Sequence, residues 1–395
     1  MEGIELKRKI LVIGGSYMNL QMKISPKNKN GDMTPGSDYS YHPYGDSAIT
    51  AISTAKLGGE CVFATRFGND TNGKRLYEYY KSCGISNTLM RKDAEAQTGM
   101  SISLYSDLDD YENFVATGAS LRFSKEDIED AFVVMPDLFL APLEELGCEE
   151  RTVVVKAAER GDDKDEPSFV KTLELAEDKA KKEDASSEKE EKAERIEPEK
   201  EKKEDSLISS ETVTSYIERE SLALYAMEKA AERGVDTLLQ YTPFTATYPL
   251  QKYENIKILV ISDEELYKLT GFFPNNTEKA LRSLMALSQK VKAKYYIVQQ
   301  GNHSAFIYDG MRYEVVSAPS TLVPRDPKAN EKKMQQSFMG ALAAEYLESK
   351  NVVRATKFAI IVSLLTRAKF GNLEKVLSRP ELEQYAYEHG IDLFR

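Results

Sequence analysis

The stretch NEKKMQQSFMGALAAEYL, residues 330–347, joins a polar start to an apolar second half. From Ser337 onward, small and apolar residues at helical spacing predict a buried helix. A helix that receives a phosphate group at its start needs backbone N–H groups that the anion can approach closely, which favours glycine there. Bulky polar residues stand at this start instead. The stretch is therefore either an altered anion-binding turn or an ordinary beginning of a helix.

The bulk composition limits the class of protein. A chain of 395 residues with 41% hydrophobic content can form one large domain or two ordinary ones. A net charge of −11 argues against a nucleic-acid or membrane-surface partner. Three scattered cysteines and three scattered histidines form no zinc spacing. No apolar run is long enough for a signal peptide or a membrane span, so we expect a soluble cytoplasmic protein.

Strand and helix patterns alternate along most of the chain. Strands are predicted at 9–15, 61–68, 235–241, 256–262, 294–301, 304–310 and 312–319. Helices are predicted at 47–58, 70–84, 222–234, 263–271, 336–350 and 352–371. This alternation predicts an α/β fold with a doubly wound, mainly parallel sheet that has helices on both faces.

Two kinds of segment interrupt that alternation. Residues of about 15–45 and 97–117 contain stretches that alternate polar and apolar side chains, which predicts a small β lid over a cleft. In the first of them, Tyr39, Tyr41 and Tyr44 could stack on a flat ligand or pack within the lid. Residues 159–205 consist mainly of Glu, Lys and Asp. This charged, low-complexity insertion is predicted to be disordered or loosely helical, because it has too few apolar residues to form a core.

Several motifs, in this order and spacing, resemble the ribokinase-like (PfkB family) carbohydrate kinases. YGDSAITAISTAKLG is similar to the family's glycine-pair turn and Ala-rich helix, and RFGNDTNGKRL contains its Gly-x-Asp-x-x-Gly link as Gly68, Asp70 and Gly73. SDEELYKLTG and VQQGNHSAFIYDG stand where the family has Asn-x-x-Glu and Thr-x-Gly-x-x-Gly. The resemblance implies a single ribokinase-like domain over residues 1–395, with the β lid and the charged insertion as additions to it.

The resemblance also implies a reaction, in which the γ-phosphate of ATP moves to a hydroxyl of a sugar or nucleoside. Such a transfer requires a carboxylate that accepts the hydroxyl proton and backbone N–H groups that stabilise the migrating phosphoryl group. It also requires Mg²⁺ between the phosphates. The family therefore implies a sugar- or nucleoside-like ligand, ATP and Mg²⁺ as cofactors, and a possible homodimer formed through the lid.

The family's catalytic turn, Asp-Thr-x-Gly-Ala-Gly-Asp, aligns with the stretch that opens this section. Its proton-accepting Asp falls on Gln336, whose amide is neutral and has no useful basicity. Its Gly-Ala-Gly falls on Lys333, Met334 and Gln335, and its leading Asp on Asn330. Side chains at the glycine positions are expected to block the close backbone approach of an anion.

The family's substrate-binding positions are also changed. The sugar-binding Asp after the first strand falls on Asn19. The glycine pair becomes Tyr44 and Gly45, with Asp46 next in the chain, and the sugar-binding Asn falls on Ile49. The resemblance thus nominates Asn19, Gly45, Asp46 and Ile49 as substrate-binding positions.

The nucleotide and metal positions are partly kept. In the nucleotide turn Gly301 remains, while the second glycine is Ser304. The Asn of Asn-x-x-Glu falls on Ser262, and Glu265 remains as the acid that would support magnesium through water. Binding of ATP and Mg²⁺ is therefore expected to be weakened.

These changes leave three hypotheses open. The first is a kinase-like protein that is weakly active or inactive and serves as a binding or regulatory module. The second is an active carbohydrate kinase with a relocated base, Asp326 or Glu331, and with Lys332 and Lys333 binding phosphate as point charges. The third is a scaffold that recruits a partner through its acidic insertion.

Overall fold

The computed structural model describes residues 8–25, 34–105, 111–141, 148–156, 213–241, 253–301, 303–322, 331–368 and 376–394. The chain divides into two compact units, the larger made of Met1–Glu149 with Ser221–Arg395 and the smaller of Glu150–Glu220. The predicted charged insertion at 159–205 lies outside the described residues, and so does Asp326.

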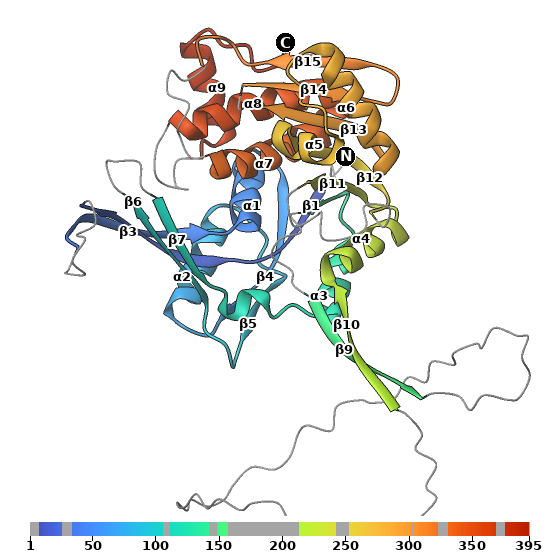
Figure 1. Ribbon diagram of the computed structural model, residues 1–395. Helices are drawn as coiled ribbons and strands as arrows, with labels where there is room; N and C mark the ends of the chain where they lie inside the picture. Colours follow the sequence, from blue (N-terminus) through green and yellow to red (C-terminus); the bar gives the residue numbers. More distant parts are fainter. Residues whose placement is uncertain are drawn as a thin grey trace, which may run out of the picture. The chain divides into compact units, whose positions relative to one another are not determined.

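A nine-stranded sheet runs through the larger unit, in the order β15-β14-β13-β12-β11-β8-β1-β4-β5 (Figure 1). Its strands are β1 (Lys9–Ile13), β4 (Glu60–Gly68), β5 (Met90–Asp93), β8 (Leu138–Ala141), β11 (Asp236–Gln240), β12 (Ile256–Ser262), β13 (Ala293–Gln300), β14 (Ser304–Tyr308) and β15 (Tyr313–Ser317). The strands from β5 to β13 pair in parallel, and β14 and β15 add antiparallel pairs at one edge. The predicted mainly parallel sheet is confirmed.

Helices cover both faces of this sheet. The helices are α1 (Asp46–Lys56), α2 (Thr71–Ser82), α3 (Lys125–Val133), α4 (Leu222–Glu232), α5 (Asp263–Thr270), α6 (Thr277–Lys290), α7 (Glu331–Ser349), α8 (Val352–Ala368) and α9 (Arg379–Glu388). In β1, Ile10 and Val12 pack into one core with α1, α7 and α8, while Leu11 and Ile13 pack into a second core with α3, α4 and α6. A strand buried on both faces is almost continuously apolar, which explains KILVI.

A separate four-stranded sheet lies in the two segments that the sequence predicts as a lid (Figure 1). It consists of β3 (Gly36–Tyr44), β2 (Tyr17–Ile24), β6 (Gly99–Tyr105) and β7 (Tyr111–Ala116), in that order. The strand β2 pairs antiparallel with β3 and parallel with β6. The short 3-10 helix η1 (Gly118–Leu121) follows β7. That this sheet covers a ligand stays a prediction.

The smaller unit contains a two-stranded sheet of β9 (Cys148–Lys156) and β10 (Val213–Ser221). These strands flank the predicted insertion in the sequence, and the sequence patterns did not predict them. Among the helices that the structure describes, none combines the length and the apolar character needed to cross a membrane.

Candidate functional site

The carboxyl end of β1 is the place where this sheet offers a ligand crevice. The neighbours of β1 are β4 on one side and β8 on the other, so the chain changes direction along the sheet at this strand. In open α/β sheets, ligands bind outside the carboxyl ends of the strands at such a switch point. Beyond Ile13, the chain passes through Ser16 into the small sheet at Tyr17.

The helix α1 begins at this end of the sheet. Its N-cap is Gly45, whose φ of 118° and ψ of 143° lie in a region that side chains disfavour. The Ser47 hydroxyl donates a hydrogen bond of 3.4 Å to the carbonyl oxygen of Ile13, which ties the first turn of α1 to β1. Of the predicted substrate positions in this helix, Asp46 is half-buried in the first turn, while Ile49 is a buried core residue without a polar group.

The helix α7 begins at Glu331 rather than at the predicted Gln336. Lys332, Lys333 and Gln335 therefore have helical backbone, because Glu, Lys, Met and Gln are good helix formers and no glycine interrupts them. Gln336 is 3% exposed, and its side-chain Oε1 has no hydrogen-bond partner among the residues that the structure describes. Residues 331–336, which align with the family's catalytic turn, thus have helical backbone.

The contact between α7 and α1 is very close. A Cβ atom on Gly340 would lie 2.7 Å from the Cβ of Ser53 and 2.7 Å from the carbonyl oxygen of Thr50. Only glycine fits there. Because residues four apart share a face of a helix, Gln336 lies on the same side of α7 as Gly340.

Asn19 belongs to a hydrogen-bonded row on one face of the small sheet. Its Nδ2 lies 3.0 Å from the Nε2 of His42, and its Oδ1 accepts a hydrogen bond of 3.0 Å from the hydroxyl of Ser103. Asn19 is 1% exposed, so these bonds satisfy a buried amide. The sequence places Asn19 at a binding position, but its two partners come from different strands and were not predicted.

The Gly68, Asp70 and Gly73 motif fastens α2 to the start of β6. The Asp70 carboxylate accepts hydrogen bonds from the backbone N–H of Gly73 (2.8 Å), from the N–H of Thr98 (2.8 Å) and from the hydroxyl of Thr98 (2.7 Å). Burial raises the pKa of Asp70, but these hydrogen bonds outweigh it and hold the pKa below its ordinary value. A Cβ on Gly73 would lie 2.2 Å from the carbonyl oxygen of Gly68, so the turn accepts no side chain there.

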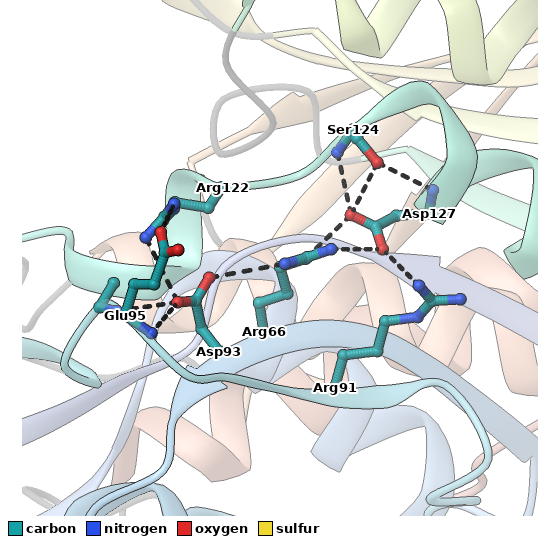
Figure 2. Close-up of polar contacts among 8 residues, drawn as sticks. Arg66, Arg91, Asp93, Glu95, Arg122, Ser124 and Asp127 are labelled. Carbon is teal, nitrogen blue, oxygen red and sulfur yellow. Dashed lines mark hydrogen bonds and ion pairs between the residues drawn. The ribbon is translucent and has the colours of Figure 1, made fainter. Parts of the chain in front are cut away.

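Next to this link lies a cluster of ion pairs at the carboxyl ends of β4 and β5 (Figure 2). The buried carboxylate of Asp127 accepts two hydrogen bonds of 2.9 Å from Arg66 and pairs with Arg91 at 3.1 Å. Asp127 also forms the capping box of α3 with Ser124. The cluster therefore joins the start of α3 to two strands of the large sheet.

A second carboxylate extends the same cluster. Asp93 pairs with Arg66 at 3.5 Å and with Arg122 at 3.3 Å. A hydrogen bond from the backbone N–H of Ala96 is the main reason that the pKa of Asp93 lies below its ordinary value. Both buried acids are matched by arginines, so the arrangement in Figure 2 holds the fold together and offers no base for chemistry.

The predicted nucleotide and metal positions follow neighbouring strands, β12 and β13. Gly301 has a φ of +50°, and Ser304 begins β14. Glu265 lies in the first turn of α5, and its carboxylate is 2.6 Å from the Nζ of Lys268. Over the part of the chain that the structure describes, no three His, Cys, Asp or Glu side chains are grouped so that they could hold a metal ion.

The structure thus brings some of the nominated residues together, while others lie elsewhere along the large sheet. Gly45, Asp46 and Ile49 lie in or before α1 at the end of β1, and Asn19 lies in the small sheet that follows. Glu265, Gly301 and Ser304 follow strands farther along the large sheet.

Comparisons with known proteins agree with this architecture. Residues 7–139 match the profile described as pfkB family carbohydrate kinase. The chain is 23% identical to the ribokinase of Haemophilus influenzae over 141 residues, which are 35% of this chain and 46% of that protein. It is 34% identical to the aminoimidazole riboside kinase of Salmonella typhimurium over 73 residues, 18% of this chain and 23% of that one. The chain therefore spans less than half the length of these relatives.

The similarity in structure extends over nearly the whole chain. The ribokinase of Arabidopsis thaliana, solved in complex with ribose and ATP, superposes with a TM-score of 0.66 at 16% identity and covers 96% of this chain and 98% of that one. The large sheet, its two helical layers and the small sheet define the class of ribokinase-like α/β proteins. Over residues 7–139 the chain is similar to the pfkB family carbohydrate kinases, and its fold as a whole is ribokinase-like.

Proposed function

We propose that this chain is a carbohydrate-kinase relative that binds a sugar- or nucleoside-like ligand but transfers phosphate weakly or not at all. In this proposal it serves as a binding or regulatory module. The observation that carries it is the start of α7 at Glu331, which makes the aligned catalytic turn part of a helix.

The helical start alters where an anion can bind. In an α-helix the first four N–H groups have no partner within the helix, and every later N–H donates to a carbonyl four residues back. The free N–H groups within the helix therefore belong to residues 331–333, while those of Gln335 and Gln336 are used. At a rise of about 1.5 Å per residue, the start of α7 lies roughly 7 Å from Gln336.

The position of the proton acceptor supports the same conclusion. An acceptor for the hydroxyl proton must be basic near neutral pH, and the amide of Gln336 is not. Asp326, one relocated base that the sequence suggests, lies outside the described residues. Glu331, the other, begins α7 and is a helical turn or more away from Gln336 along the chain.

ATP is proposed as a ligand because relatives of the family include kinases solved with ATP, such as the Arabidopsis ribokinase. Mg²⁺, when bound between phosphates, neutralises their charge. The residues present fit Mg²⁺ poorly. The carboxylate of Glu265 is already paired with Lys268, and among the described residues it does not belong to any group of three side chains that could hold a metal ion. We therefore expect weak Mg²⁺ dependence of any ATP binding.

The small sheet supports a proposal about the partner. Three aromatic side chains on its edge strands are exposed: Tyr39 (64%), Tyr41 (47%) and Phe114 (55%). Exposed aromatic surface of this kind favours protein contacts, and we propose a second copy of this chain as the partner. The elution volume in size-exclusion chromatography, compared with that of a Tyr41→Asp/Phe114→Asp variant, tests it. A monomeric natural chain contradicts the proposal.

The test of the central proposal is ADP release with MgATP and a mixed pool of sugars and nucleosides. We expect background rates from the natural chain and from Gln336→Asp, because one carboxylate does not remove the helical start. A variant with Lys333→Gly, Met334→Ala, Gln335→Gly and Gln336→Asp, which rebuilds the family turn, serves as the matched comparison and should release more ADP than either.

One outcome overturns the proposal. If the natural chain releases ADP in proportion to an added sugar at ordinary kinase rates of about 1–100 s⁻¹, it is an active kinase. The variants Asp326→Asn and Glu331→Gln would then identify the relocated base, since loss of activity in one of them names the proton acceptor.

A further inference from the structure

One hydrogen bond in the small sheet joins its two edge strands. The Nδ2 of Asn113 in β7 donates to the phenolic oxygen of Tyr44 at the end of β3, at 3.0 Å. The strands β2 and β6 lie between them. Because neighbouring strands are about 4.8 Å apart, the two edge strands of a flat sheet of this kind are separated by roughly 14 Å. The two side chains therefore reach across the face of the sheet.

The face that they cross is polar, and its inner side chains are buried, while Asn113 at the edge is exposed. The register places Asn19 opposite His42 and Ser101, and it places Ser103 opposite Asn113. Since alternate residues of a strand share a face, Tyr44 lies on the same face as His42. The polar side chains of this face are Asn19, His42, Ser101, Ser103 and Asn113.

These groups bond mainly to one another. Ser103 donates to Asn19 at 3.0 Å, and Ser101 donates to the Oδ1 of Asn113 at 2.7 Å. Neutral hydroxyl and amide groups of this kind match the hydroxyls of a polyol, which are both donors and acceptors. In this structure the hydroxyl of Tyr44 bonds to this face in the way that a ligand hydroxyl could. Tyr44 directly precedes Gly45, the N-cap of α1, and so lies beside the ligand crevice.

We propose that the phenol of Tyr44 is an internal occupant of the polar face of the small sheet, and that a polyol ligand binds there only after displacing it. This proposal rests on the proposed function, because it takes this face as part of the ligand site. The contact is autoinhibitory. The apparent dissociation constant equals the intrinsic one divided by the fraction of molecules whose phenol has moved away.

The test is isothermal titration calorimetry with D-ribose and with adenosine, each without ATP. Tyr44→Gly and Tyr44→Ala remove the ring, and Tyr44→Phe keeps the ring but loses the hydrogen bond to Asn113. Tyr387→Ala is the control, because Tyr387 lies on α9, away from the small sheet in the fold, and is 89% exposed. Circular dichroism and thermal melting verify that each variant is folded, and Tyr44→Ala serves if the two adjacent glycines of Tyr44→Gly prevent folding.

We expect Tyr44→Ala to bind ribose or adenosine at least about tenfold more tightly than the natural chain, and Tyr387→Ala to bind like the natural chain. Tyr44→Phe loses the hydrogen bond that holds the ring on this face, so it should bind more tightly than the natural chain and no more tightly than Tyr44→Ala. Equal affinity in the natural chain and in Tyr44→Ala overturns the proposal. Binding by Tyr44→Phe that is no tighter than that of the natural chain also overturns it, and so does the absence of binding in every folded variant. Because no ATP is present, these results are independent of ADP release, which tests the proposed function.

Discussion

The link between β4 and α2 and the start of α7 both align with family motifs, but they differ in what they retain. In the link, Gly68, Asp70 and Gly73 are all present, and each has a structural role that the contacts explain. At the start of α7 the aligned glycines and the catalytic Asp are replaced, and the backbone is helical. The residues kept are those that the fold requires. In the proposed function, the residues replaced are those that only the family's reaction would require.

The contacts make this difference concrete. The carboxylate of Asp70 accepts three hydrogen bonds, and Gly73 has no room for a methyl group. By contrast, the side-chain oxygen of Gln336 is buried with no partner among the described residues. The following predictions test whether mutations at the retained link lower the free energy of unfolding more than mutations at the start of α7.

The largest loss is expected for Asp127→Ala, beside the retained link. This change removes the buried carboxylate that Arg66 and Arg91 share, so that they keep only Asp93 and Asp130 as partners, and it removes the capping box of α3. The lost charged hydrogen bonds and the lost helix cap together should cost about 3–5 kcal/mol in the free energy of unfolding. Urea denaturation measures it, with the exposed Glu78→Ala on α2 as the control, expected to change by less than about 0.5 kcal/mol.

Asp70→Ala should follow, with a loss of about 2–3 kcal/mol. The reason is that the backbone N–H groups of Gly73 and Thr98 lose a charged acceptor. Amide hydrogen exchange should also become faster at the start of β6, where Thr98 is held. A loss below about 0.5 kcal/mol would show that the retained motif contributes little to stability, which would contradict its proposed structural role.

Gln336→Leu should change the free energy of unfolding by less than about 1 kcal/mol, in either direction. Leucine is close to glutamine in size, and the change removes a buried amide oxygen that lacks a partner. Thermal melting at neutral pH measures it. Destabilisation by more than about 2 kcal/mol would show that Gln336 has a structural role comparable with that of Asp70.

The smallest effect is expected for Glu129→Gln, on the same helix as Asp127 but 38% exposed. Hydrogen bonds from Arg233 and Tyr225 lower the pKa of Glu129 from 4.5 to about 2. A lowered pKa stabilises the folded state above the unfolded value, and this contribution is lost as the pH falls from about 4.5 to about 2. The unfolding free energies of the natural chain and the variant should therefore differ slightly at pH 7 and converge near pH 2.

Much of the large sheet could be predicted because its strands have strong local patterns. The continuous apolar runs of β1 and β12 identify them as buried strands without reference to the rest of the chain. The strand β5, MRKD, has no such pattern, and it is a strand because it pairs with β4. Short strands whose conformation depends on a neighbour are not visible in their own sequence.

The candidate site shows a similar limit. The position of Asn19 followed from the family resemblance, but its bonds to His42 and Ser103 depend on the register of three strands. Register is set by long-range pairing, so the sequence did not predict it. The start of α7 was predicted too late, because the resemblance to a glycine turn outweighed the helix-forming residues from Glu331 to Gln335.

The pairing of β9 with β10 has a consequence for how this chain can vary. The segment 157–212 leaves from one of these strands and returns to the other, so both of its ends are attached to the same two-stranded sheet. Closing a longer or shorter loop between fixed ends changes the free energy by only about 0.6 kcal/mol for each doubling of length. A change in the length of this segment is therefore expected to alter the free energy of closure only slightly, which makes it a position where a lineage can acquire new sequence and an experimenter can insert a reporter domain.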